Sequence, residues 1–257
     1  MFGPFAAELI IFKGRILFKA GAIQNEPHRH FSASIIISLQ KKINVWADKK
    51  SHLVDGIMVA PNVEQALLAD GPVLNLQVDP ELPEYRSLQH LMGKRKTLHV
   101  KEDIVESIRE LPFWDQEIQV QDAEIIWGEV IRLISSFDMK DVVLDERIEK
   151  ACRLMQQDLL NVPAANSLSE MVGLSESRFL HLFTENKGLT LRSYVKWLRV
   201  RKAVFMLSEN KSLTEAALEA GFSDSAHLSR VFKNMFGLSP SVLLKNSRFV
   251  QVKFGKV

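Results

Sequence analysis

Two histidines, His28 and His30 in the stretch PHRH, have the type and spacing of residues that bind a metal. On a β-strand, residues i and i+2 point to the same face, so both imidazoles would converge on one site. A catalytic zinc site ordinarily has three protein ligands and an open position. The residues after His30 are FSASI and contain no carboxylate. The pair therefore predicts a polar pocket or a strand-end cap that holds no metal.

The charge of the chain is divided unevenly between its two halves. Residues 146–257 carry 17 Lys and Arg against 10 Asp and Glu, a net charge of +7, whereas residues 1–145 have a net charge of −5. A basic half joined to an acidic half is typical of a nucleic-acid-binding module attached to a second domain. The single cysteine, Cys152, excludes an internal disulfide. Together with the lack of an apolar run long enough to span a bilayer, it predicts a cytoplasmic protein with no membrane partner.

The periodicity of apolar residues changes along the chain. Residues 1–97 contain short β-rich runs separated by Gly, Pro, Asn and Asp, a pattern typical of a small barrel or sandwich. Residues 98–144 have apolar residues at helical spacing, interrupted at Pro112, and residues 145–250 are predicted to be helical throughout. The sequence thus predicts an α+β protein of two domains, with connecting helices between them.

The helical half contains an internal repeat. The segment GLSESRFLHLFTENKGLT (173–190) is similar to GFSDSAHLSRVFKNMFGLS (221–239), and Phe183 and Phe232 correspond at a spacing of 49. Each copy predicts a helix that ends at a glycine, then a serine or aspartate cap and a second amphipathic helix. A plain helical bundle is the alternative. Two helix-turn-helix copies in a basic half favour DNA binding.

The stretch between the two copies is about twenty residues long, or roughly 30 Å of helix. A connecting helix of that length would hold the two second helices about one DNA turn apart, roughly 34 Å. Both helices could then enter successive major grooves on one side of the duplex.

The stretch AALEAGFSDSAHLSRVFKNMFGLSPSVL (216–243) resembles the AraC/XylS family of bacterial transcription regulators. The resemblance implies a DNA-binding domain with two helix-turn-helix motifs over 145–250, a cupin-like effector-binding barrel over 1–97, and dimerisation and linker helices over 98–144. The partners it implies are double-stranded promoter DNA, a small-molecule effector, a second copy of the chain in a homodimer, and RNA polymerase if the protein is an activator.

Carried over position by position, the resemblance also implies which residues contact DNA. Arg178 and Arg230 have the fork that reads guanine O6 and N7, although either could bind a phosphate instead. The residues expected at base edges are Ser177, Arg178 and His181 in the first copy and Ser225, Ala226, His227 and Arg230 in the second, with Lys187 and Lys233 at phosphates.

Two segments in the first half are similar to cupin motifs, GAIQNEPHRH and DGIMVAPNVEQAL (55–67). Where cupin enzymes have a histidine after the second motif's proline, this chain has Gln65. We therefore expect His28, His30, Trp46 and Gln65 to line an effector pocket, with no metal, no cofactor and no catalytic residue. The alternative, a metal-dependent cupin enzyme with an accessory helical domain, is disfavoured by the incomplete ligand set.

Overall fold

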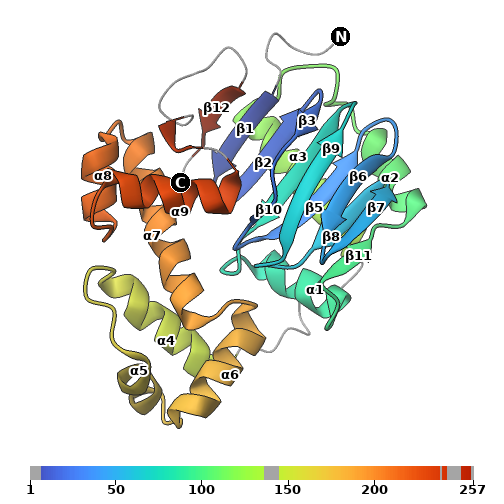
Figure 1. Ribbon diagram of the computed structural model, residues 1–257. Helices are drawn as coiled ribbons and strands as arrows, with labels where there is room; N and C mark the ends of the chain where they lie inside the picture. Colours follow the sequence, from blue (N-terminus) through green and yellow to red (C-terminus); the bar gives the residue numbers. More distant parts are fainter. Residues whose placement is uncertain (1–6, 136–144, 238, 242–249, 256–257) are drawn as a thin grey trace. The chain divides into compact units, whose positions relative to one another are not determined.

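The computed structural model describes residues 7–135, 145–237, 239–241 and 250–255. The chain divides into two compact units, one formed by Met1–Lys140 with Asn234–Val257 and the other by Asp141–Lys233 (Figure 1). The described strands all belong to the first unit, and the second is helical. The predicted two-domain α+β organisation is thus confirmed. The boundary expected after residue 144 adjoins residues 136–144, which lie outside the described residues.

The strands of the first unit form two hydrogen-bonded sheets. In the seven-stranded sheet the order is β11 (Thr97–His99), β8 (Gly56–Val59), β5 (Ala33–Ser38), β10 (Val73–Val78), β2 (Arg15–Ala20), β1 (Ala7–Phe12) and β12 (Val250–Phe254). The five-stranded sheet contains β3 (Ile23–Gln24), β9 (Glu64–Ala69), β6 (Ile43–Ala47) and β7 (Lys50–Val54), with β4 (His28–Arg29) paired to β9. The predicted β-rich domain is confirmed, but as two sheets rather than one closed barrel.

Strand β5 is buried along its whole length because both of its faces are covered. Ile36 lies in an apolar cluster with Val45 and Leu67 of the five-stranded sheet. The alternate residues Ile35 and Ile37 belong to a second cluster that includes helical residues. An alternation of apolar and polar residues would not suit a strand covered on both sides, which explains the continuous run of isoleucines.

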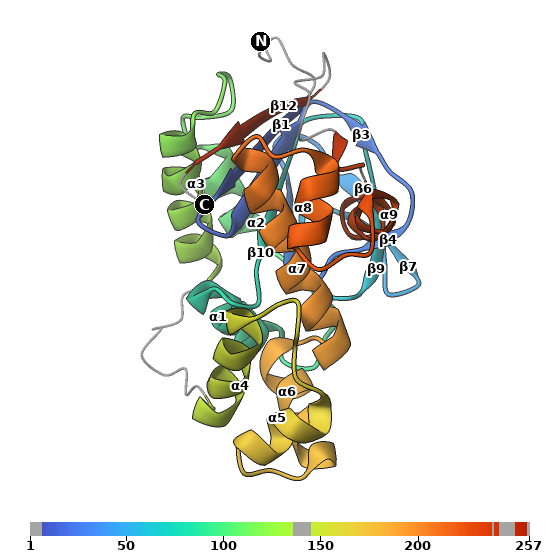
Figure 2. The ribbon, with the colours of Figure 1, turned by 90° about the vertical axis from the view of Figure 1, so that its left-hand side faces the viewer.

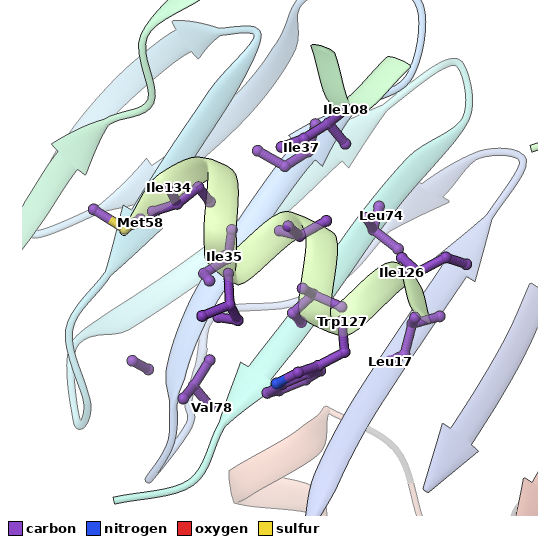
Figure 3. Packing of buried hydrophobic residues seen from close by; sticks show 14 of the residues in the cluster. Leu17, Ile35, Ile37, Met58, Leu74, Val78, Ile108, Ile126, Trp127 and Ile134 are labelled. Carbon is purple, nitrogen blue, oxygen red and sulfur yellow. The ribbon is translucent and has the colours of Figure 1, made fainter. Parts of the chain in front are cut away.

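Helices α1 (Pro83–Met92), α2 (Glu102–Arg109) and α3 (Val120–Ile134) provide this second layer. Figure 3 shows Ile126 and Trp127 of α3 against Leu17 and Leu74 of the sheet. The apolar residues of α2 and α3, in the segment that the resemblance assigns to dimerisation, are largely buried by this packing. Val105, Ile108, Ile126 and Val130 are each 0% exposed.

The last strand, β12, was not predicted from the sequence. It pairs in parallel with β1, with Leu9 opposite Val252, and the Gly255 N–H donates to the Ile11 carbonyl at 2.8 Å. Figures 1 and 2 show this red strand beside the blue β1. A Cβ atom at Gly255 would come within 2.8 Å of the Phe12 Cβ, so the close approach requires glycine. Strand β12 therefore forms one edge of the seven-stranded sheet.

The second unit contains α4 (Glu146–Gln157), α5 (Ala165–Met171), α6 (Glu176–Lys187), α7 (Leu191–Ser208), α8 (Leu213–Glu219) and the greater part of α9 (Ser225–Phe236). Phe179, Phe183 and Tyr194 are fully buried, and the rings of Phe183 and Tyr194 meet edge to face at 5.2 Å. Across the described residues, no helix has both the length and the apolar character needed to cross a membrane.

Candidate nucleic-acid interface and interior polar site

Helices α6 and α9 begin in closely similar ways. Each follows a glycine in the left-handed region, Gly173 with φ 71° and Gly221 with φ 84°. The Ser175 hydroxyl accepts the Arg178 N–H at the start of α6. At the start of α9 the Asp224 carboxylate accepts the His227 N–H at 2.6 Å. This bond, followed by the Ser223 hydroxyl, holds the pKa of Asp224 below its usual range.

The exposed face of α6 carries the residues predicted to contact base edges. Ser177, Arg178 and His181 are exposed, whereas Phe179 and Phe183 on the opposite side are buried. His181 lies close to one acidic neighbour, with 3.8 Å between its Nδ1 and the Glu185 Oε2. The helix thus presents cationic and hydrogen-bonding side chains to solvent.

The corresponding face of α9 is less uniform. Ala226, Arg230 and Lys233 are exposed, whereas Ser225 and His227 are partly buried. The His227 ring contacts its own turn: Nδ1 lies 3.2 Å from the Ser223 Oγ, and the ring meets Phe222 edge to face at 5.3 Å. The His227 side chain therefore stabilises the first turn of α9, and only part of it is exposed on the surface of the helix.

Lys187 has a different position from the predicted one. Its side chain is almost fully buried, with Nζ 3.1 Å from the Glu149 Oε1 of α4. The ammonium group also lies 5.9 Å from the centre of the Tyr194 ring of α7. The prediction that Lys187 contacts phosphate is therefore wrong, because the side chain joins α4, α6 and α7 in the interior.

The connection between the two helix pairs is α7, whose 18 residues correspond to roughly 27 Å of helix. Trp197 and Leu198 are buried, as expected for a helix with a packed face. The guanidinium of Arg199 donates to the Leu159 carbonyl at 3.1 to 3.2 Å. A Cβ at Gly221 would lie 3.0 Å from the Arg199 Nε, so this packing also requires glycine at the α8–α9 turn.

The two histidines that suggested a metal site lie side by side in the interior of the first unit. Their Nε2 atoms are 2.9 Å apart, and the His28 Nδ1 lies 2.8 Å from the Glu26 carbonyl oxygen. Burial lowers the pKa of both rings, most strongly for His30, where the neighbouring His28 adds to the effect. Gln65 of β9 stands opposite His28 in the strand pairing and is 4% exposed.

Three further buried residues extend this polar group. The Gln65 Nε2 donates to the Ser34 Oγ at 2.8 Å, and the Ser32 hydroxyl donates to the Gln77 Oε1 at 2.5 Å. Ser32, Ser34 and Gln77 were not among the residues predicted from the sequence. The sequence does contain a sign of them: polar residues interrupt the apolar runs SASIIIS and VLNLQV. Polar residues in such runs indicate a buried polar group.

Trp46 does not join this group. It alternates along β6 with the buried residues Val45 and Ala47 and shares the outward face with exposed Asn44. The structure therefore brings together three of the four residues expected to line an effector pocket, His28, His30 and Gln65. Among the described residues, no group of three or more His, Cys, Asp or Glu is arranged to hold a metal.

The helical half is similar to the DNA-binding domains of known regulators. Residues 168–246, which include α6 and α9, match the model of a helix-turn-helix domain family. The arabinose operon regulatory protein of Escherichia coli is 34% identical over 101 residues, covering 38% of this chain and 34% of that protein. An uncharacterized HTH-type transcriptional regulator of Haemophilus influenzae is 30% identical over 103 residues, covering 40% and 35%. The chain thus spans about a third of the length of these relatives.

Solved structures extend the likeness to the fold of the whole chain. ToxT from Vibrio cholerae O395 has a TM-score of 0.56 at 12% identity and covers 90% of this chain and 96% of that one. ToxT bound to an unsaturated fatty acid has a TM-score of 0.55 at 13% identity, covering 90% and 94%. The domain match and the regulators that share it agree with the resemblance to the AraC/XylS family seen in the sequence, over the helix-turn-helix region of this chain.

Proposed function

We propose that this chain is a sequence-specific transcriptional regulator in which α6 and α9 are the reader helices of two helix-turn-helix motifs. The observation that carries the proposal is the correspondence of the two exposed faces. At a constant spacing of 49 residues, Ser177 matches Ala226 and His181 matches Arg230. These positions are exposed on helices that begin with similar caps after left-handed glycines.

Each exposed side chain has a chemistry suited to double-stranded promoter DNA. Arg178 and Arg230 can form paired hydrogen bonds to guanine O6 and N7, and Ala226 can contact a thymine methyl group. Lys233, in the last turn of α9, is suited to a phosphate. The net charge of +7 over residues 146–257 supports attraction to the duplex as a whole.

We propose that the N-terminal unit is a cupin-like domain that binds a small-molecule effector. The proposed binding site is the polar group that includes His28, His30 and Gln65. The likeness of the fold to that of fatty-acid-bound ToxT supports an effector role. Further proposed partners are a second copy of the chain in a homodimer and, if the protein is an activator, RNA polymerase. Sedimentation at micromolar concentration tests the dimer, which a monomer would contradict.

Selection of bound sequences from a random pool of double-stranded DNA, followed by footprinting, tests DNA recognition directly. We expect the full chain to enrich a defined motif with two contacted regions separated by about one helical turn, or roughly 10 base pairs. Enrichment of no sequence, with binding that depends only on salt, would contradict a sequence-specific regulator.

A further inference from the structure

The edges of the two sheets meet along β7 and β11 in the N-terminal unit. Strand β7 is the last strand of the five-stranded sheet, and β11 is the last strand of the seven-stranded sheet. The His52 Nδ1 of β7 lies 3.1 Å from the His99 Nε2 of β11 (Figure 1). Near the start of both strands, the Lys96 ammonium binds the Asp48 carboxylate at 2.8 Å. These two contacts join the strand edges into one seam.

The seam, formed by residues 48–52 and 94–99, carries an excess of positive charge. It contains five lysine and arginine residues and one carboxylate, although residues 1–145 as a whole have a net charge of −5. All five cations are exposed: Lys49, Lys50, Lys94, Arg95 and Lys96. Like charges that lie close together repel one another, so a ligand of opposite charge would stabilise this group.

Regular structure holds the seam in place. Asp48 and Lys49 form the two-residue loop between β6 and β7, and both have positive φ, 49° and 64°, as in tight hairpin turns of type I′. Arg95 donates to the Met92 and Leu91 carbonyls at the end of α1, at 2.9 and 2.7 Å. The cations are therefore carried by a hairpin turn, a helix end and two strand edges.

Two of the five cations have partners within the fold. Lys96 pairs with Asp48, and this bond holds the pKa of the Asp48 carboxyl below its usual range. Arg95 caps α1. Among the described residues, the other three cations take part in no ion pair: Lys49, Lys50 and Lys94. Lys50 also shares a face of β7 with His52, the residue that contacts β11. The charge of these three lysines is thus available to a ligand.

We propose that the seam binds the phosphate backbone of the DNA that flanks the sequence read by α6 and α9, an assignment that rests on the proposed function. Contacts from lysine to phosphate give affinity that does not depend on sequence. Each strand of the duplex has one phosphate per about 3.4 Å of helix axis. Because the lysine stem is long and flexible, three ammonium groups within one short seam can reach adjacent phosphates.

Two other roles for these cations are less well supported. Lysines on edge strands discourage pairing with another chain, but that role requires charge on the strand itself. Only Lys50 lies within a strand, and the other four cations lie in the β6–β7 loop or between α1 and β11. An acidic protein surface would also attract the seam. Duplex DNA is favoured because the proposed reader helices hold it on the same chain, at a high local concentration.

Two variants with the same loss of charge test the seam. In the seam variant, the three lysines without an ion pair are replaced by glutamine: K49Q, K50Q and K94Q. In the control variant, three exposed lysines from elsewhere in the unit are replaced: K13Q, K41Q and K42Q. Lys41 and Lys42 precede β6 and so lie at the opposite end of that strand from the β6–β7 loop.

Both variants and the unaltered full chain are titrated with a short duplex of about two helical turns and a long duplex of about five, each containing the selected motif. On the long duplex, we expect the seam variant to reduce the slope of log binding constant against log salt concentration by about two to three units, since each lost phosphate contact removes about 0.9 unit. The control variant should reduce it by less than about one unit. On the short duplex the seam variant should match the unaltered chain.

An unchanged slope in the seam variant on the long duplex would overturn the inference, and is the result expected if the seam only guards the strand edges or binds an acidic protein. Equal reductions in the two variants would also overturn it, because net charge alone would then explain them. An equal reduction on the short duplex would overturn the flanking position. If the unaltered chain selects no motif, the proposed function fails, and the same comparison on a long duplex of random sequence still decides whether the seam binds a phosphate backbone.

Discussion

The Glu8 carboxylate and the Lys19 ammonium form a buried ion pair between β1 and β2, with 2.9 Å between Oε2 and Nζ. The antiparallel register places the two residues directly opposite each other. Glu8 also accepts the Ile118 N–H at 2.9 Å, and Lys19 donates to the Gln116 carbonyl at 2.8 Å. The pair therefore joins strands β1 and β2 of the seven-stranded sheet to the segment that leads into α3.

Replacing Lys19 with Met should destabilise the protein by about 3 kcal/mol, because removing one partner leaves the other charge buried without full compensation. Urea unfolding followed by circular dichroism measures the loss. The control is Lys13→Met, whose partner Glu124 is 2.9 Å away but about half exposed. That exposed pair should contribute less than about 1 kcal/mol. Equal losses in the two variants would contradict the role assigned to the buried pair.

Replacing Arg230 with Ala should weaken binding to the selected DNA site by about 1–3 kcal/mol and relax the base preference at one position. Fluorescence anisotropy and a repeated sequence selection measure the two effects. Arg132→Ala is the matched control, since Arg132 is an exposed arginine of α3 that pairs with Glu129. An unchanged base preference in Arg230→Ala would show that this side chain does not read a base.

Lys187 and Lys233 should behave in opposite ways. Lys187→Met removes a buried partner of Glu149 and should cost about 2 kcal/mol of stability, less than a fully buried pair because Glu149 keeps contact with solvent. Lys233→Ala should leave stability unchanged. It should reduce the slope of log binding constant against log salt concentration by about one unit, because one phosphate contact is lost. Unfolding curves and salt titrations distinguish the two. If folded Lys187→Met also had a reduced salt slope, Lys187 would contact a phosphate after all, as predicted from the sequence.

Gly221→Ala should be more destabilising than Gly173→Ala. Both glycines have positive φ, which costs a residue with a Cβ about 1–2 kcal/mol. Only at Gly221 does the added Cβ also meet neighbours, the Arg199 Nε at 3.0 Å and the Leu159 carbonyl oxygen at 3.2 Å, whereas nothing lies within 4 Å at Gly173. Thermal unfolding of the two variants compares the costs, and equal melting temperatures would contradict the predicted crowding.

Several features followed from the sequence because they depend on neighbours in the chain. The alternation of β-rich runs, the change to helical periodicity and the 49-residue spacing of Phe183 and Phe232 all express local chemistry. The caps at Ser175 and Asp224 act within three residues of themselves. The same local signals located the exposed residues of α6, since the opposite face had to be apolar to pack.

Lys187 shows where local signals fail. A lysine near the end of an amphipathic helix predicts a solvent-exposed cation, yet Glu149, 38 residues earlier in the chain, allows this one to be buried. Strand β12 was not predicted from the sequence for a related reason. Residues Val250–Phe254 pair in parallel with β1, and the glycine that follows them packs closely against Phe12, a contact between residues 243 positions apart.

The two-domain α+β organisation, the duplicated helix-turn-helix pattern and the resemblance to AraC/XylS regulators could all be predicted from the sequence, because periodicity, capping and spacing are properties of the chain. Which polar residues meet depends on the folded arrangement of the elements. It placed Trp46 on the outer face, buried Lys187 against Glu149 and brought two histidine Nε2 atoms within 2.9 Å of each other beside Gln65. These relationships depend on the packing of sheets and helices, which positions side chains distant in sequence to within a few tenths of an ångström.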